Sequence, residues 1–427
     1  MNKAFITFLF LTFFLILTNS ACVEQKVSSE IRTEKPTSTS PADVEIAEAG
    51  KNINQFPNLA KNYNRLAFAF LKKVRETGDY SLNRQAENAL KKSLEIEPDN
   101  YEAMVLQTQI LLSDHRFEEG LELSNKLETL RPNDLAIYVA KTDALTELGK
   151  YKEAVEAAQK AVNLRPNAVS YARVANLRFL YGDISGALEM RKVAVKIADP
   201  DDYEFVAWNY VELGNVLYNT GKFDEAMYQY DSALENFPNY YLALAAKGRT
   251  FAAKNDFENA IKFFQLSQTR VPLPETVIAL GDVFAKIGKT DEAQKQYDLV
   301  EIIEQKLNNT DQRRLALLWA DHDIRLDEAL QIAATEHAKR SDIYTADIFA
   351  WCLFKKGRLT QAKSAITEAM NLKTKDARIY FHAGMIEKGL GNQNEAKRLL
   401  QMALQTNPAF NILQTEQAKS ALRELGN

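Results

Sequence analysis

Residues 210–238 read YVELGNVLYNTGKFDEAMYQYDSALENFP, and the spacing of small and apolar residues in this stretch decides the fold. Tyr210, Leu213 and Leu217 lie three or four residues apart, which places them on one face of a helix. A second helical run follows and ends at Pro238, because proline cannot continue a helix interior. The stretch therefore predicts two helices joined by a short turn.

Small residues occupy the positions at which the two predicted helices meet. Gly214 in the first helix and Ala226 in the second leave room for a close approach. Tyr230 and Ala233 continue the inner face of the second helix. Gly221 lies between the two runs, where it can adopt the left-handed conformation that ends a helix. The pattern favours a tightly packed antiparallel hairpin.

These offsets resemble the tetratricopeptide repeat (TPR), a helix–turn–helix unit with a period of about 34 residues. The same offsets recur from about residue 60 to residue 410, which makes about ten units. Beside the stretch quoted above and a weaker unit at 60–100, the units span 101–134, 135–167, 168–201, 241–273, 274–307, 310–342, 343–376 and 377–410. The unit at 310–342 is atypical because it lacks the Leu-Gly pair and the final proline.

The resemblance implies an all-α fold, a right-handed α-solenoid of about ten TPR helix-turn-helix repeats with a C-terminal capping helix. First helices would line a continuous concave groove, which in this family generally binds other proteins. The expected organisation is a signal peptide (1–21), a lipid-anchored flexible tether (22–52), an N-terminal array of about seven repeats (53–309), a C-terminal segment of about three repeats (310–410) and a capping helix (411–427).

The N-terminus predicts export from the cytoplasm. An apolar run at 4–17 follows Lys3 and has the length of a secretory signal. Small residues directly before Cys22 resemble the bacterial lipobox, in which the cysteine becomes the lipidated first residue, although Asn19 departs from that pattern. We expect an acylated Cys22. Ordinary cleavage after Ser20 or Ala21 and an uncleaved membrane anchor are the alternatives.

Each of these three readings delivers the body of the chain outside the cytoplasm, to the periplasm or the cell surface. Val23 follows the lipobox cysteine, and by family analogy in a two-membrane bacterium this favours an outer-membrane lipoprotein. Cys352 is the only other cysteine, so the sequence predicts no disulfide framework. We therefore expect stability to come from packing.

Candidate partner-binding residues follow from the repeat register. In TPR proteins the ninth position of each first helix often faces the ligand, and here these positions are Gln109, Asp143, Asn176, Asn215, Arg249 and Asp282. Side-chain amides donate and accept hydrogen bonds together, so the consecutive Asn176, Asn215 and Arg249 could hold the backbone of an extended peptide. The alternative is that asparagine is simply common at this position.

Aromatic residues extend this candidate groove. Register places Trp208 and Tyr218 toward the groove, with Phe179 in a similar place in the preceding repeat. Such side chains are typical anchors of protein interfaces. They could instead stack on sugar rings, which leaves a glycan-binding or cell-wall module as the second hypothesis, or they could pack between repeats.

Other activities find little support in the sequence. A two-carboxylate clamp would need Lys or Arg at the fifth position of neighbouring first helices, where Val139, Ala172 and Val211 stand. The net charge of −4 argues against nucleic-acid binding. No phosphate-binding loop or nucleophile motif is present, so we expect no enzyme activity, no catalytic residue, no cofactor and no metal. The dense polar cluster at residues 321–323 (Asp-His-Asp) leaves a metal or catalytic role as a third hypothesis.

Overall fold

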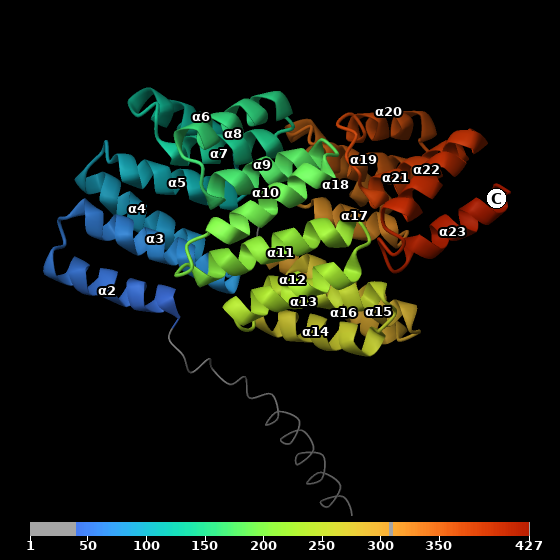
Figure 1. Cartoon of the computed structure of the whole chain (residues 1–427), viewed down its shortest axis with the longest axis horizontal. Helices are drawn as coiled ribbons and strands as arrows, with labels where there is room; N and C mark the ends of the chain where they lie inside the picture. The colour runs from blue at the N-terminus through green and yellow to red at the C-terminus, as the bar shows by residue number, and fades with distance from the viewer. Residues whose placement is uncertain (1–39, 307–310, 427) are drawn as a thin grey trace, which may run out of the picture. The chain divides into compact units, whose positions relative to one another are not determined.

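The computed structural model describes residues 40–306 and 311–426, which fold into 22 helices without a strand in these two ranges (Figure 1). The helices are α2 (Pro41–Gln55), α3 (Ala60–Thr77), α4 (Leu82–Ile96), α5 (Tyr101–Ser113), α6 (Phe117–Leu130), α7 (Leu135–Glu147), α8 (Tyr151–Leu164), α9 (Ala168–Leu180), α10 (Ile184–Ile197), α11 (Tyr203–Asn219), α12 (Phe223–Asn236), α13 (Tyr241–Ala253), α14 (Phe257–Arg270), α15 (Pro274–Lys286), α16 (Thr290–Lys306), α17 (Arg313–Asp321), α18 (Leu326–Lys339), α19 (Ile343–Lys355), α20 (Leu359–Ala369), α21 (Ala377–Gly389), α22 (Gln393–Thr406) and α23 (Gln414–Glu424).

Consecutive helices from α3 to α22 pair as hairpins, and each hairpin packs on the next one. The predicted all-α solenoid of helical hairpins is confirmed. The atypical unit also forms a hairpin, α17 with α18, although α17 has only 9 residues. The terminal helix α23 packs on α21 and α22, at the place where the sequence predicts a helix.

Glycine residues, which have no side chain, set how closely the two helices of a hairpin approach. A Cβ atom at Gly248 would lie 2.7 Å from Cδ1 of Phe264, and one at Gly214 would overlap the ring of Tyr230. The turn between α11 and α12 needs Gly221, whose φ of 75° is a left-handed conformation that other residues adopt at a cost. The small positions that define the repeat therefore have the predicted packing role.

Hairpins about six repeats apart in the sequence also contact each other, which the repeat pattern does not predict. The Tyr151 hydroxyl accepts a hydrogen bond of 2.8 Å from the backbone N–H of Ile343. The Asn407 amide donates to the Tyr218 carbonyl at 2.9 Å, and the Thr374 hydroxyl donates to the Leu180 carbonyl. We call this line of contacts the seam.

Apolar packing and buried charges both cross the seam. One contiguous core cluster contains Leu145 and Leu177 together with Ile343 and Ile379. Beside it, Arg313 and Arg340 each pair with the Asp311 carboxylate at 2.8 Å, while Arg340 reaches Glu147 at 3.6 Å. The seam therefore couples hairpins that are far apart in the sequence, in addition to the neighbour contacts of a simple solenoid.

One part of the predicted organisation needs correction. Residues 41–52 were expected in a flexible tether, but they form most of α2. The helix starts there because Ser40 and Asp43 exchange backbone-to-side-chain hydrogen bonds of 3.2 and 3.3 Å, the reciprocal arrangement of a capping box. Good helix formers follow it, and Glu45 pairs with Lys72 of α3 at 2.6 Å.

The predicted signal peptide, Cys22 and residues 22–39 of the tether lie outside the described residues. Among the helices that the structure describes, none combines the length and the hydropathy needed to cross a membrane.

Candidate functional site

Three consecutive first helices bring predicted groove residues to one cavity of about 220 Å³. We call it the arginine pocket. Its lining residues come from α9 (Ala175, Asn176, Phe179), α10 (Arg191), α11 (Glu212, Asn215, Val216, Asn219), α13 (Arg249) and α19 (Tyr344). Helix α19 reaches the pocket because the seam brings the later hairpins over the first helices of the earlier ones.

Asn176, Asn215 and Arg249 line the pocket together, as their equivalent positions in successive hairpins predict. The structure uses Asn215 internally, however. Its carbonyl oxygen accepts hydrogen bonds from Arg249 Nη2 at 2.8 Å and from the Tyr230 hydroxyl at 3.1 Å. Its amide donates to Glu212 at 3.0 Å. Asn215 therefore orients Arg249 and Glu212 and has little capacity left for a peptide backbone.

Two of the three aromatic candidates are buried beneath the pocket. Tyr218 is 4% exposed, and the Arg249 guanidinium lies over its ring at 4.4 Å. Phe179 is 7% exposed and packs with Ala187 and Val216. Phe179 lines the pocket and Tyr218 supports Arg249, and neither presents an open ring to a partner.

Trp208 is half-buried at the edge of this region. Phe205 stacks on it with ring centres 5.8 Å apart, and the Arg191 guanidinium lies over its ring at 5.2 Å. A sugar ring stacking on Trp208 would have to compete with these neighbours. The geometry thus gives the glycan hypothesis no support.

Arg191 is the functional candidate that the sequence analysis missed. It lies on the second helix of its hairpin, between the fully buried Ala187 and Ala194 on the inner stripe of α10. An arginine in an otherwise small and apolar stripe was the available sign. Arg191 is 4% exposed and donates to Glu212 through Nη2 at 3.3 Å. Burial lowers the pKa of its guanidinium, and Glu212 only partly opposes that effect.

The remaining groove candidates lie apart from the pocket. Gln109 is exposed on α5. Asp143 forms an ion pair of 2.7 Å with Arg173. Asp282 is 8% exposed, accepts a hydrogen bond of 2.9 Å from the Tyr297 hydroxyl and lies 3.1 Å from Nε2 of His322. Asp143 and Asp282 are therefore engaged within the protein.

The Asp-His-Asp cluster does not converge on one point. Asp321 accepts hydrogen bonds of 2.7 Å from the indole of Trp351 and the amide of Gln414, while Asp323 pairs with Lys355 at 2.7 Å. Burial raises the pKa of Asp321 to about 6. No group of His, Cys, Asp and Glu side chains in the described part of the chain is arranged to hold a metal ion.

Cys352 is also an unpromising nucleophile. It is 1% exposed, and burial raises the pKa of its thiol to about 12. It therefore stays a neutral thiol at physiological pH, as a buried apolar residue does.

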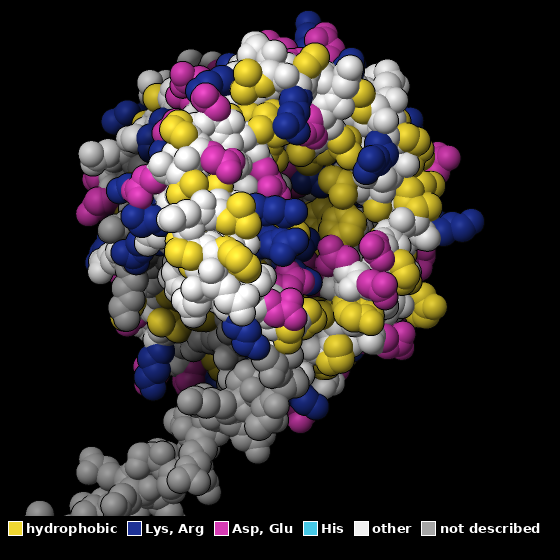
Figure 2. All heavy atoms as spheres, turned by 90° about the vertical axis from the view of Figure 1, so that its left-hand side faces the viewer, with side chains coloured by type: hydrophobic (Ala, Val, Ile, Leu, Met, Phe, Trp, Pro, Cys, Tyr) yellow, Lys and Arg dark blue, Asp and Glu magenta, His cyan; other side chains and the backbone are white. Residues whose placement is uncertain are grey.

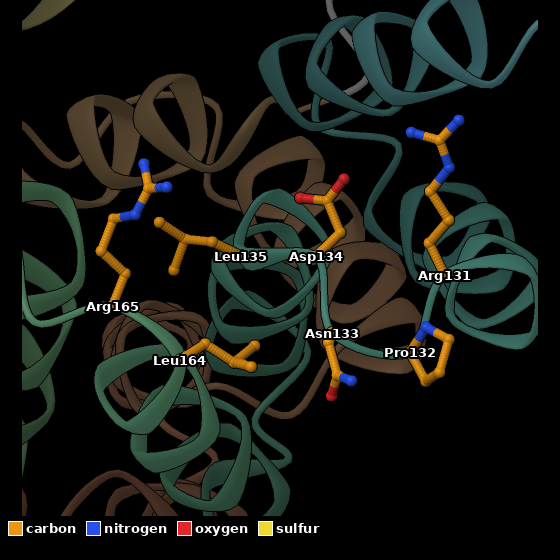
Figure 3. A pocket seen from close by; sticks show the side chains of 7 residues that line it. All are labelled: Arg131, Pro132, Asn133, Asp134, Leu135, Leu164 and Arg165. Atoms are coloured by element: carbon orange, nitrogen blue, oxygen red, sulfur yellow. The ribbon is translucent and has the colours of Figure 1, made fainter.

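A larger, more open pocket of about 510 Å³ lies where α6 connects to α7 and α8 to α9 (Figure 3). The side chains of Arg131, Asp134 and Arg165 extend to the same side of it. Asp134 caps α7 and accepts a hydrogen bond of 2.9 Å from the Tyr101 hydroxyl, and Arg131 lies over the Tyr101 ring at 3.9 Å. These contacts account for Asp134 and Arg131 as structural residues.

Comparisons with known proteins identify the repeats. Sequence profiles described as tetratricopeptide repeat match residues 135–168, 211–273 and 377–410. A search of curated proteins found no match to the chain. The predicted TPR repeats are confirmed.

Three solved structures are similar to this chain over different lengths. The Cut9–Hcn1 hetero-tetramer of the APC/C aligns with a TM-score of 0.51 and 17% identity, over 90% of this chain and 67% of that chain. A tetratricopeptide repeat protein from Parabacteroides merdae aligns with a TM-score of 0.36 and 19% identity, over 61% and 99%. A thermophilic TPR protein from Thermus thermophilus aligns with a TM-score of 0.36 and 20% identity, over 48% and 98%. At 17% identity the likeness to the first of these structures shows the fold alone.

Proposed function

We propose that this chain of TPR repeats is a non-enzymatic scaffold of the bacterial cell envelope, which binds a partner polypeptide on its concave face and supports assembly of a complex. One observation carries the proposal. Side chains of α9, α11 and α13, first helices of three consecutive hairpins, meet in one polar pocket. Proteins of this fold commonly act as protein-interaction scaffolds.

The composition of the pocket suits a polypeptide better than a reaction. Its polar groups are those of arginine, asparagine, glutamate and tyrosine, which recognise and orient a ligand. Apart from the pocket, one face of the molecule has Lys and Arg side chains gathered at the edge of a recess, beside hydrophobic side chains (Figure 2). Such a mixture of charge and apolar surface is typical of peptide-binding sites.

The proposed address rests on the N-terminal sequence. A lipid on Cys22 would hold the solenoid at a membrane, and Val23 favours the outer membrane. Mass spectrometry of the mature N-terminus tests this part directly. We expect an acylated Cys22 that is lost in Cys22→Ala, and an unmodified mature N-terminus would contradict it.

Site-specific photo-crosslinking in intact cells tests the scaffold. A crosslinking amino acid at position 176 stands at the exposed edge of the arginine pocket, and one at position 228 replaces a tyrosine that is 69% exposed and lies outside it. We expect a defined polypeptide adduct from position 176 and none from position 228. Equal adducts from both positions, or none from position 176, would contradict the proposal.

A further inference from the structure

Two arginines of the arginine pocket, the buried Arg191 and the half-buried Arg249, have buried N–H groups without a hydrogen-bond acceptor. They are Nε and Nη1 of Arg191 and Nε of Arg249, judged within the residues that the structure describes. A buried donor without an acceptor costs free energy, and a buried charge costs more. A ligand that supplies acceptors and a negative charge would remove both costs.

The charges of the lining favour an anion. Arg191 and Arg249 contribute two positive charges, and Glu212 is the one acid among the lining residues, which leaves a net charge of +1. Asn176 and Asn219 also line the pocket, and neither side-chain amide forms a hydrogen bond with another described residue. Their amides can therefore complete the coordination of an anion.

The volume limits the size of the bound group. A cavity of about 220 Å³ corresponds to roughly seven water molecules at about 30 Å³ each. It can hold one side chain, the end of a chain or a small acid. A folded domain could not enter it.

The anion is better matched by a carboxylate than by a phosphate. A guanidinium fork fits the oxygens of a carboxylate and of a phosphate alike, so the charge of the lining decides between the two anions. A carboxylate carries one negative charge, which equals the net charge of the lining. A phosphate carries close to two, and Glu212 would repel the second.

We propose that the arginine pocket binds a single carboxylate group, held by Arg191 and Arg249 with the amides of Asn176 and Asn219. The carboxylate is the C-terminus or an acidic side chain of the partner polypeptide, and this assignment rests on the proposed function. A free carboxylic acid is the other source of the same chemistry. The site differs from the two-carboxylate clamp considered above, since Arg191 comes from the second helix α10 and apolar residues hold the fifth positions of the first helices.

The test uses the full chain and three probes: N-acetyl-tetra-alanine with a free carboxyl, the same peptide as its C-terminal amide, and acetate. NMR titration follows the resonances of the pocket residues. We expect the free acid to bind at least about tenfold more tightly than the amide, since charged hydrogen bonds are lost in the amide. Similar binding of acid and amide would overturn the proposal.

Two variants change the charge of the pocket in opposite directions. Asn176→Asp is nearly isosteric at an exposed position and lowers the lining charge, so the affinity for the free acid should fall about tenfold. Glu212→Gln removes the lining acid and should tighten binding. Lys192→Gln is the matched control, because it alters the net charge of the chain as Asn176→Asp does but lies exposed on α10 outside the pocket. Equal losses in Asn176→Asp and Lys192→Gln would sink the carboxylate site.

The probes also separate the two sources and the two proposals. Tighter binding of the peptide acid than of acetate identifies a polypeptide carboxylate, and equal binding identifies a free acid. Carboxylate binding without a crosslinked partner at position 176 would contradict the scaffold proposal and support the carboxylate site. A crosslinked partner without any preference for the free acid would support the scaffold proposal and contradict the carboxylate site.

Discussion

At the scale of single residues, two kinds of residue shape this protein: glycines at helix contacts and charged residues with little exposure to solvent. Gly214 has no side chain where the ring of Tyr230 packs, and Tyr230 itself is fully buried. Arg191 is buried and Asp321 is half-buried, and each is hydrogen-bonded to neighbouring helices. Arg191 donates to Glu212, and Asp321 accepts from Trp351 and Gln414. The first kind of residue sets the packing of a hairpin, and the second kind creates the polar sites between hairpins.

A methyl group at Gly214 should destabilise the fold. Its Cβ would lie 2.8 Å from Cδ1 of Tyr230, whose ring is fully buried. We expect Gly214→Ala to lower the free energy of unfolding by about 1–3 kcal/mol, measured by urea denaturation. Gly50→Ala is the control, since nothing lies within 4 Å of that Cβ, and it should leave stability unchanged or raise it slightly. Equal effects at both positions would refute this reading.

The buried carboxyl of Asp321 should make stability depend on pH. Burial raises its pKa from 3.8 to about 6, so the folded state binds the proton more tightly than the unfolded state. Its favourable contribution is complete below pH 3.8 and is lost as the pH rises through about 6. Asp321→Asn, which keeps an oxygen for Trp351 and Gln414, should therefore gain stability relative to the wild type between pH 4 and pH 7, by at most about 3 kcal/mol.

The carboxyl of Asp311 should make stability depend on pH in the opposite direction to Asp321. Charge-assisted hydrogen bonds from Arg313 lower its pKa despite burial, so its contribution is present above pH 3.8 and fades as the pH falls further. Asp311→Asn should lose stability relative to the wild type at neutral pH and less so in acid. Thermal unfolding from pH 3 to pH 8 measures both variants, and parallel curves for them would show the assignment to be wrong.

At the scale of the elements, hairpins are held by their own small residues and by distant hairpins across the seam. The start of α19 shows this, because Asp342 caps its first turn through the N–H groups of Tyr344 and Thr345, and Tyr151 of α8 accepts from Ile343. The hairpins, but not the seam, could be predicted from the sequence. The hairpins follow from the repeat of glycine, alanine and proline positions, and Asn176, Phe179, Asn215 and Arg249 reach one pocket because register places them there.

Other features could not be predicted from the sequence, for physical reasons. Register gives the face of a helix but not the hydrogen bonds of a side chain, so the internal use of Asn215 and the covering of Tyr218 by Arg249 were not visible. Arg191 could not be predicted because the repeat register expects second helices to contribute packing residues, whereas this one lines the pocket. Residues 41–52 were judged by the average composition of a longer stretch, although Ser40 and Asp43 start a helix there.

Loss of the Tyr151 hydroxyl should loosen the seam locally. In Tyr151→Phe the buried N–H of Ile343 has no acceptor, which costs about 1–3 kcal/mol. We expect hydrogen exchange at Ile343 to become at least about tenfold faster, while α11 and α12 keep their protection. Tyr138→Phe is the matched control, because the Tyr138 hydroxyl bonds Glu128 and Pro132 near its own hairpin. Unchanged exchange at Ile343 in Tyr151→Phe would contradict this role.

At the scale of the whole solenoid, the seam is the feature that a repeat pattern is least able to reveal. Contacts between hairpins about six repeats apart depend on the small rotation from each hairpin to the next, summed along the array. Because of that return, Tyr344 of α19 joins residues of α9, α11 and α13 in the arginine pocket. The arginine pocket is thus lined mainly by the first helices α9, α11 and α13, with one residue from the second helix α10 and one from the later helix α19.

The central claim is that a partner polypeptide lies on this concave face. Hydrogen–deuterium exchange of the full chain, with and without the polypeptide captured at position 176, tests it most directly. The account predicts slower exchange in the first helices α9, α11 and α13 and at the start of α19, with α12 and α14 unchanged. Slower exchange confined to the second helices, or no change in α9 to α13, would contradict it.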